Sequence, residues 1–92
     1  MSHDFAYDYT IFPEADNIQF KALCKQIANI PEIKFQETLI DVDGSIICLY
    51  LLDGRKINAY NDYEVDAIYV KSDANLSAYL TDYWSTHKKN RP

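Results

Sequence analysis

The sequence predicts an α+β fold in which an antiparallel sheet of four to five strands packs against two helices. Two Asp-Gly pairs, at residues 43–44 and 53–54, divide the middle of the chain into three strand-like segments. Asp-Gly is a leading signal for a tight β-hairpin, so these segments form a predicted meander. Apolar residues at helical spacing lie on both sides of this region. The predicted order is therefore strand, helix, three or four strands, helix.

The first strand and the first helix are predicted from the N-terminal third. Residues 5–12 are rich in aromatic and β-branched types, and Pro13 ends this run. Asp16 followed by Gln19 matches a capping pair, which predicts a helix over residues 14–29. Its expected apolar face consists of Ile18, Ala22, Leu23, Ile27 and Ile30.

The predicted meander contains strands 35–42, 45–52 and 55–60. Residues 45–52 are apolar on both faces of a strand, so we expect them to form the central strand, covered on each side. Residues 63–71 alternate between larger apolar and acidic types, which predicts a last strand with an exposed acidic end.

A final helix is predicted over residues 74–87, capped by Ser72 or Asp73. Its apolar spacing is the clearest in the chain and consists of Leu76, Tyr79, Leu80, Tyr83, Trp84 and His87. We expect short frayed ends at residues 1–4 and 88–92. At 92 residues, the chain fits one domain with one core.

Charge and hydropathy exclude several classes of partner. Fourteen acidic against nine basic residues leave a net charge of −5, which opposes binding to phosphate backbones. Helix, three strands and helix is also the order of double-stranded RNA-binding domains, but the predicted last helix lacks their basic cluster. The chain lacks a secretory signal and any apolar run long enough to cross a bilayer, so we expect a cytoplasmic protein that binds neither nucleic acid nor membrane.

Residues that could support catalysis, a metal or a cofactor are sparse. His3 and His87 lie close to the chain ends, and the two glycines are explained by the hairpin turns. Asp41 to Ser45 is similar to the start of a calcium loop, but Tyr50 stands where the closing Glu is required. Cys24 and Cys48 have no metal-ligand spacing and are interpreted as reduced core thiols. We therefore expect no enzyme activity, no cofactor and no metal.

The candidate site comes from an unusual tyrosine content, eight in 92 residues. Tyrosine offers a rigid contact with a polar tip, and nearby carboxylates add recognition of Lys or Arg. Residues 57–70 contain tyrosines and acids but no base. The predicted partner-binding residues are Tyr60, Asp62, Tyr63, Glu64, Asp66 and Tyr69. The alternative is that these tyrosines are ordinary strand residues and the acids a solvated edge.

Two functions remain open at the level of sequence. The first is a small acidic inhibitor or neutraliser that covers a basic site on another protein, as immunity proteins, antitoxins and DNA mimics do. The second is a structural or regulatory module without an inhibitory role. It would act as a homodimer joined by the strand at 63–71 or the helix at 74–87.

Overall fold

The computed structural model describes residues 5–79. It contains one sheet of five antiparallel strands and a helix of twelve residues, an α+β fold as predicted. The elements are β1 (Tyr7–Phe12), α1 (Asn17–Ala28), β2 (Ile33–Ile40), β3 (Ile46–Leu52), β4 (Arg55–Asp62) and β5 (Ala67–Ser72). Helical residues also begin at 77, but most of the predicted final helix, both histidines and the expected frayed ends lie outside the described residues.

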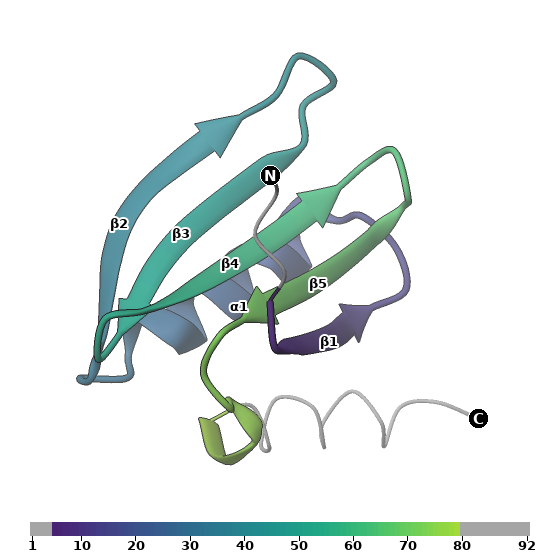
Figure 1. Cartoon of the computed structure of the whole chain (residues 1–92). Coiled ribbons are helices and arrows are strands. Elements are labelled where there is room, and N and C mark those ends of the chain that lie inside the picture. Colours follow the sequence, from purple (N-terminus) through teal and green to yellow (C-terminus); the bar gives the residue numbers. More distant parts are fainter. Residues whose placement is uncertain (1–4, 80–92) are drawn as a thin grey trace.

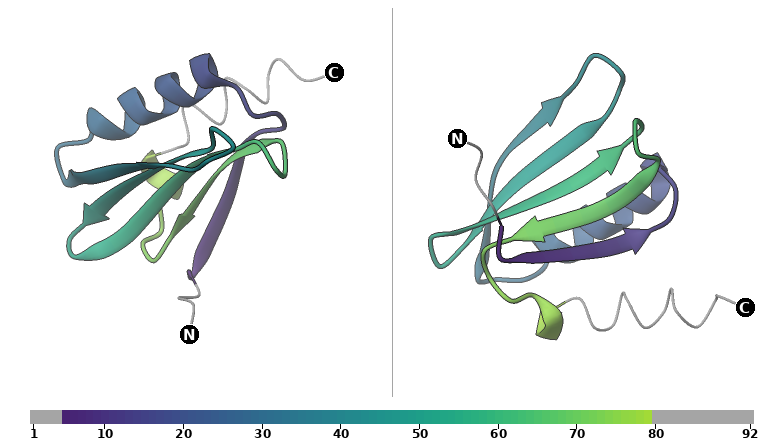
Figure 2. Two further views of the ribbon diagram at one scale, coloured as in Figure 1. Left: turned by 90° about the horizontal axis from the view of Figure 1, so that it is seen from above. Right: turned by 45° about the vertical axis from the view of Figure 1, so that its right-hand side comes forward.

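The strand order across the sheet is β1-β5-β4-β3-β2. Strands β2 to β5 form a meander, and β1 returns to pair with β5 (Figure 1). Helix α1 crosses one face of the sheet, which Figure 2 shows from above. Both edge strands contain an irregularity, between Thr10 and Phe12 in β1 and between Phe35 and Glu37 in β2. Such bulges twist an exposed edge and disfavour pairing with another chain.

Both predicted hairpins form, and the tighter one joins β3 to β4. Leu52 pairs with Arg55, which leaves Asp53 and Gly54 as a two-residue turn with φ of 53° and 79°. Two successive positive φ values are the signature of the turn that Asp-Gly favours. The other hairpin is wider, because Ile40 pairs with Ile46 and residues 41–45 lie between them. Within this turn the Gly44 amide donates to the Asp41 carbonyl at 3.0 Å, and Gly44 has a φ of 89°.

Helix α1 begins at Asn17, three residues later than predicted, although Asp16 caps it as the capping pair indicates. The Asp16 side chain accepts hydrogen bonds from the amides of Ile18 and Gln19 at 2.8 and 3.0 Å, so it caps the helix. The apolar face was predicted only in part. Ile18 is 78% exposed and Ala22 is also exposed, whereas Phe20 is buried with Leu23 and Ile27. The buried stripe therefore follows the spacing i, i+3, i+7 from Phe20.

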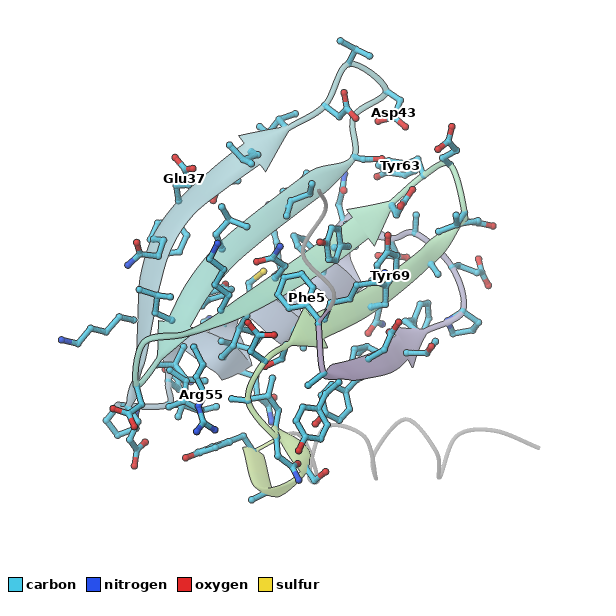
Figure 3. The ribbon with its side chains drawn as sticks, in the orientation of Figure 1. Phe5, Glu37, Asp43, Arg55, Tyr63 and Tyr69 are labelled. Carbon is cyan, nitrogen blue, oxygen red and sulfur yellow. The ribbon has the colours of Figure 1, made fainter. Side chains whose placement is uncertain are left out.

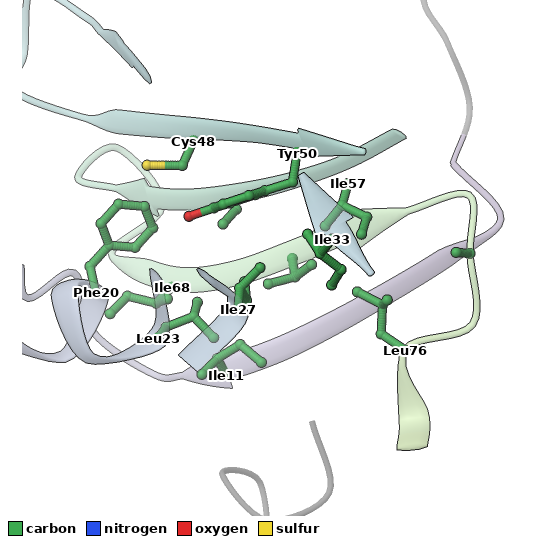
Figure 4. Packing of buried hydrophobic residues seen from close by; sticks show 13 residues of the cluster. Ile11, Phe20, Leu23, Ile27, Ile33, Cys48, Tyr50, Ile57, Ile68 and Leu76 are labelled. Atoms are coloured by element: carbon green, nitrogen blue, oxygen red, sulfur yellow. The ribbon is translucent and has the colours of Figure 1, made fainter. Parts of the chain in front are cut away.

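The core lies between α1 and the face of the sheet that the helix covers (Figure 4). Ile57 from β4 and Ile68 and Val70 from β5 are fully buried there. Leu76, which follows β5, closes one end of the same cluster. Among residues 5–79, every buried side-chain nitrogen or oxygen has a hydrogen-bond partner.

The prediction that residues 45–52 form the central strand is wrong. β4 is central, and β3 lies one place from the edge. Cys48 and Tyr50 of β3 are buried on the helix side, but Leu49 and Leu51 on the other face are only half-buried. Leu49 and Leu51 share a hollow with Phe5 and Lys56, so long side chains partly cover this second apolar face.

The predicted strand at 63–71 is also wrong in its first half. β4 extends to Asp62, residues 63–66 form a turn, and β5 begins at Ala67. The Asp62 carboxylate accepts hydrogen bonds from the amides of Glu64 and Val65, at 3.0 and 3.2 Å. This local bonding competes with strand pairing and closes the turn. The alternation in residues 63–66 therefore does not reflect two faces of a strand.

The expected caps of the final helix are corrected as well. Ser72 is the last residue of β5 and is fully buried, with its hydroxyl bonded to the Ala74 amide at 2.9 Å. Helical residues begin at 77, and the Asn75 side chain accepts from the Ser77 amide at 2.9 Å. No helix among residues 5–79 has the length and hydropathy that crossing a membrane requires.

Candidate functional site

Three connecting segments meet at one end of the sheet. They are residues 13–17, which end on the first residue of α1, residues 41–45 between β2 and β3, and residues 62–67, which run from the last residue of β4 to the first of β5. Antiparallel pairing brings them together, because β1, β2 and β4 all run toward this end. We call these three segments the acidic end. Figure 3 shows Asp43 and Tyr63 beside each other there.

Hydrogen bonds join the three segments into one surface. The Tyr63 amide donates to the Ser45 hydroxyl at 2.9 Å, and the Tyr63 hydroxyl donates to the Asn17 side chain at 2.8 Å. The Ala15 amide donates to the Asp66 carboxylate at 2.9 Å. The segments are therefore held relative to one another by contacts that are distant in sequence.

Asn61 anchors this arrangement from beneath. Its side chain is fully buried at the end of β4, where an apolar residue would otherwise fit the core. The Asn61 carbonyl oxygen accepts from the Asp16 amide at 3.0 Å, and its amide group donates to the Asn17 side chain at 2.9 Å. A buried amide with both functions paired specifies one position for the start of α1.

Charge is segregated along the molecule. The acidic end holds half of the chain's acids, and none of its three segments contains a Lys or Arg. The seven acids are Glu14, Asp16, Asp41, Asp43, Asp62, Glu64 and Asp66. Four bases, Lys34, Arg55, Lys56 and Lys71, lie near the opposite ends of their strands. The acidic end therefore has a strongly negative field despite a modest net charge of −5.

Apolar side chains are exposed between these carboxylates. Val42 is fully exposed at the tip of one turn, and Val65 is 60% exposed at the tip of another. Tyr63 is 40% exposed between them, although its hydroxyl is bonded to Asn17. Ile40 and Ile18, which flank the segments, are more than 70% exposed. Exposed apolar groups surrounded by charge are typical of surfaces that bind other proteins.

Tyr69 and Asp62 form a hydrogen-bonded polar pair within the site. The Tyr69 hydroxyl donates to the Asp62 carboxylate at 2.7 Å. This bond, together with the amides of Val65 and Glu64, holds the pKa of Asp62 below its usual value despite partial desolvation. Burial and the same carboxylate raise the pKa of Tyr69. Asp62 is therefore ionised at neutral pH and serves to hold the turn.

A stacked tyrosine pair lies next to the acidic end, on the face of the sheet away from α1. The rings of Tyr60 and Tyr69 are 4.6 Å apart between centroids and nearly parallel, and the Lys71 ammonium lies 5.9 Å from the Tyr69 ring. Both tyrosines border a hollow of about 130 Å³, whose acidic lining residues are Asp41, Asp43, Asp62 and Glu64. Small-molecule pockets typically measure about 300 to 1,000 Å³, so this hollow suits the tip of one side chain better.

The six residues predicted from sequence divide into two groups. Tyr60, Asp62 and Tyr69 lie together on the face of the sheet away from α1. Tyr63 and Asp66 instead bond to segment 13–17 on the helix side. Glu64 lies in the turn between the two groups and is exposed.

Sequence reasoning missed most of the surface that completes the acidic end. Asp41 and Asp43 were interpreted only as turn residues, and Glu14 only as the start of a helix. Their acidic side chains were visible, but their proximity to Glu64 depends on strand order, which a single sequence does not supply. The adjacency of Cys24 and Cys48, whose sulfur atoms are 3.6 Å apart, was missed for the same reason.

Comparison with protein-family models, with curated proteins and with solved structures gave no match to this chain. Over residues 5–79, no three His, Cys, Asp or Glu side chains converge as metal ligands do. The chemistry of the acidic end is therefore argued from its carboxylates, tyrosines and exposed apolar groups.

Proposed function

We propose that this protein is a small acidic protein-binding domain whose acidic end covers a basic site on a partner protein, as an inhibitor or neutraliser does. The observation that carries the proposal is the convergence of seven acids, without a base, around exposed Val42 and Val65. A cytoplasmic location belongs to the same proposal, in keeping with two free thiols.

The two kinds of side chain have different roles in such an interface. The carboxylates attract a cationic surface over roughly a Debye length, about 8 Å at physiological salt, and so speed the encounter. Val42, Val65 and the ring of Tyr63 supply the short-range contact that removes water. A Lys or Arg of the partner fits the hollow between Asp43 and Glu64.

The internal bonding of the acidic end supports a recognition role. Asp43 accepts from the Ser45 amide at 2.9 Å, and Asp62 and Asp66 are bonded within or between segments. A surface that is already ordered loses less conformational entropy on binding. The proposed interface is thus pre-organised.

The proposal is tested by capture from the native host at low salt, followed by mass spectrometry. Three baits are compared: the unmodified chain, Glu14→Lys/Glu64→Lys, and Glu32→Lys/Glu37→Lys. Glu14 and Glu64 belong to the acidic end and make no side-chain hydrogen bond among the described residues, so their replacement leaves the turns intact. Glu32 and Glu37 are exposed elsewhere, and both double variants change the net charge equally.

The proposal requires a basic protein that the unmodified and control baits retain and the Glu14→Lys/Glu64→Lys bait loses. Retention should also weaken as salt is raised. Equal loss from both double variants would mean that general acidity, and no particular surface, explains the binding, and equal recovery by all three baits would mean that neither pair of acids contributes to it. Recovery of no basic protein by any bait would refute the neutraliser function.

Self-association as a structural or regulatory homodimer is the second candidate. The strand first considered for it is unsuitable, because β5 is paired on both sides. The observation that favours it now is edge strand β2, where Phe35, Leu39 and Ile40 are each at least 45% exposed. Light scattering at high concentration separates the two candidates, since a monomer throughout would remove the homodimer.

A further inference from the structure

Cys24 and Cys48 form a close thiol pair between the helix and the sheet. Cys24 lies in the middle of α1 and Cys48 in β3, and the Cys24 thiol donates to the Cys48 sulfur at 3.6 Å. Figure 4 shows Cys48 and the Tyr50 hydroxyl on the side of β3 that faces α1. The two cysteines are distant in sequence, so their proximity is a product of the fold.

The surroundings of the pair are polar and accessible from one side. The Thr38 hydroxyl lies 3.6 Å from the Cys48 sulfur, and the Tyr50 hydroxyl is hydrogen-bonded to the pair. Cys48 is 93% buried, but Cys24 is partly exposed and Thr38, on edge strand β2, is exposed. A small oxidant can therefore approach the sulfurs at this margin of the core.

We propose that Cys24 and Cys48 are a reversible redox pair, which a hydroperoxide converts to a disulfide that ties α1 to β3. This inference does not depend on the proposed function, because the pair lies away from the acidic end. It revises the interpretation of both cysteines as inert core thiols.

The hydrogen bond between the two thiols favours Cys48 as the nucleophile. The Cys24 thiol donates toward Cys48, and this bond lowers the pKa of Cys48, although burial opposes the shift. The same bond and burial raise the pKa of Cys24. A thiol that donates to its neighbour favours the neighbour's thiolate, which is the form that reacts with peroxides.

Oxidation proceeds in two balanced steps. The Cys48 thiolate attacks one oxygen of the hydroperoxide, which breaks the O–O bond, forms a sulfenic acid and releases an alkoxide that takes a proton to become the alcohol. The Cys24 sulfur then loses its proton and attacks the Cys48 sulfur, and the hydroxyl leaves as water. Two thiols and one hydroperoxide yield one disulfide, one alcohol and one water.

The disulfide needs only a small movement. Bonded sulfur atoms lie about 2.05 Å apart, so the two sulfurs must approach by about 1.5 Å. Rotation of the two cysteine side chains, together with a slight shift of α1, brings the sulfur atoms to this distance. The bond closes a long loop, so we expect the unfolding temperature to rise by roughly 10 °C. Reduction of the disulfide should bring the unfolding temperature back to its original value.

The test uses the full chain, reduced and then treated with one molar equivalent of hydrogen peroxide. Intact mass spectrometry should find a monomer lighter by two hydrogen atoms, and thiol titration after unfolding should find no free thiol. Dithiothreitol should restore both thiols. Prior treatment with phenylarsine oxide, which bridges neighbouring thiols, should prevent the mass loss.

The matched variants are Cys24→Ser and Cys48→Ser. Each should retain its one thiol or carry a single oxygen adduct, without the loss of two hydrogens in a monomer. The inference is overturned if the unmodified chain keeps both thiols under peroxide that oxidises free cysteine. It is also overturned if oxidation yields only disulfide-linked dimers whose fraction rises with protein concentration. Both of these outcomes are measured on the unmodified chain, so they can be interpreted even if a cysteine variant does not fold.

Discussion

At the scale of single residues, Asn61 has the largest structural influence on the candidate site. It occupies a core position in β4, yet it is bonded to the Asp16 amide and to the Asn17 side chain. Asp16 caps α1, and the Asn17 side chain also accepts a hydrogen bond from the Tyr63 hydroxyl. One buried amide thus links the central strand, the helix start and the turn after β4.

Asn61→Ala should destabilise the fold by about 2 kcal/mol, because it empties a fully buried position, removes the acceptor of the Asp16 amide and removes one of the two donors to the Asn17 oxygen. Urea unfolding measures this change. Asn58→Ala is the control on the same strand, where the half-buried side chain donates to the Tyr60 hydroxyl. Its cost should stay below about 1 kcal/mol, and equal costs for the two variants would contradict the role of Asn61.

The Tyr69 and Asp62 pair makes a prediction about pH. Because the folded state holds the pKa of Asp62 below its unfolded value of about 3.9, this carboxylate contributes stability above that pH. The contribution is lost as pH falls through the folded pKa. Tyr69→Phe removes the main cause, so the pKa of Asp62 should rise toward its usual value. Carboxyl titration by NMR checks this, and an unchanged Asp62 titration would show that the bond is unimportant.

At the scale of elements, the sequence predicted what local chemistry decides. The two Asp-Gly turns, the Asp16 cap and the strands on either side of Gly54 lie where local signals place them. The wrong predictions come from places where two local interactions compete and the sequence alone does not show which one prevails. In residues 63–66 an apolar-acidic alternation looks like a strand, but side-chain bonding by Asp62 closes a turn there.

Two further predictions were wrong because their outcome depends on tertiary packing. The double apolar pattern of residues 45–52 predicted a central strand, but sheet order depends on how β1 returns to β5. Ile18 has helical spacing with Ala22, yet both are exposed because the helix presents Phe20 to the sheet. Periodicity identified the helix, and only packing identified its buried face.

The helix cap gives a prediction at this scale. Asp16→Ala should cost about 1 kcal/mol of stability, since the amides of Ile18 and Gln19 lose their acceptor. Asp16→Asn keeps an acceptor but removes the charge, so it should recover most of the loss in urea unfolding. If Asp16→Asn were as unstable as Asp16→Ala, the effect would lie in the charge and not in the cap.

At the scale of the whole molecule, the central feature is the gathering of seven acids without a base at the acidic end. Residues 57–70 showed part of this in sequence, through tyrosines and acids without a base. The full surface needed three segments that are distant in sequence to meet, as Ala15 and Asp66 do across 51 residues. Antiparallel topology supplies that meeting, so the sequence predicted the character of the site but not its extent.

The most direct test maps where a basic protein captured from the host touches this domain, by following each backbone amide in NMR during a titration. Shifts should concentrate in residues 13–17, 41–45 and 62–67, with the amides of Val42 and Glu64 among the largest. Added salt should reverse them. Shifts centred on edge strand β2 or on the stacked pair of Tyr60 and Tyr69, with the three segments unchanged, would contradict the account.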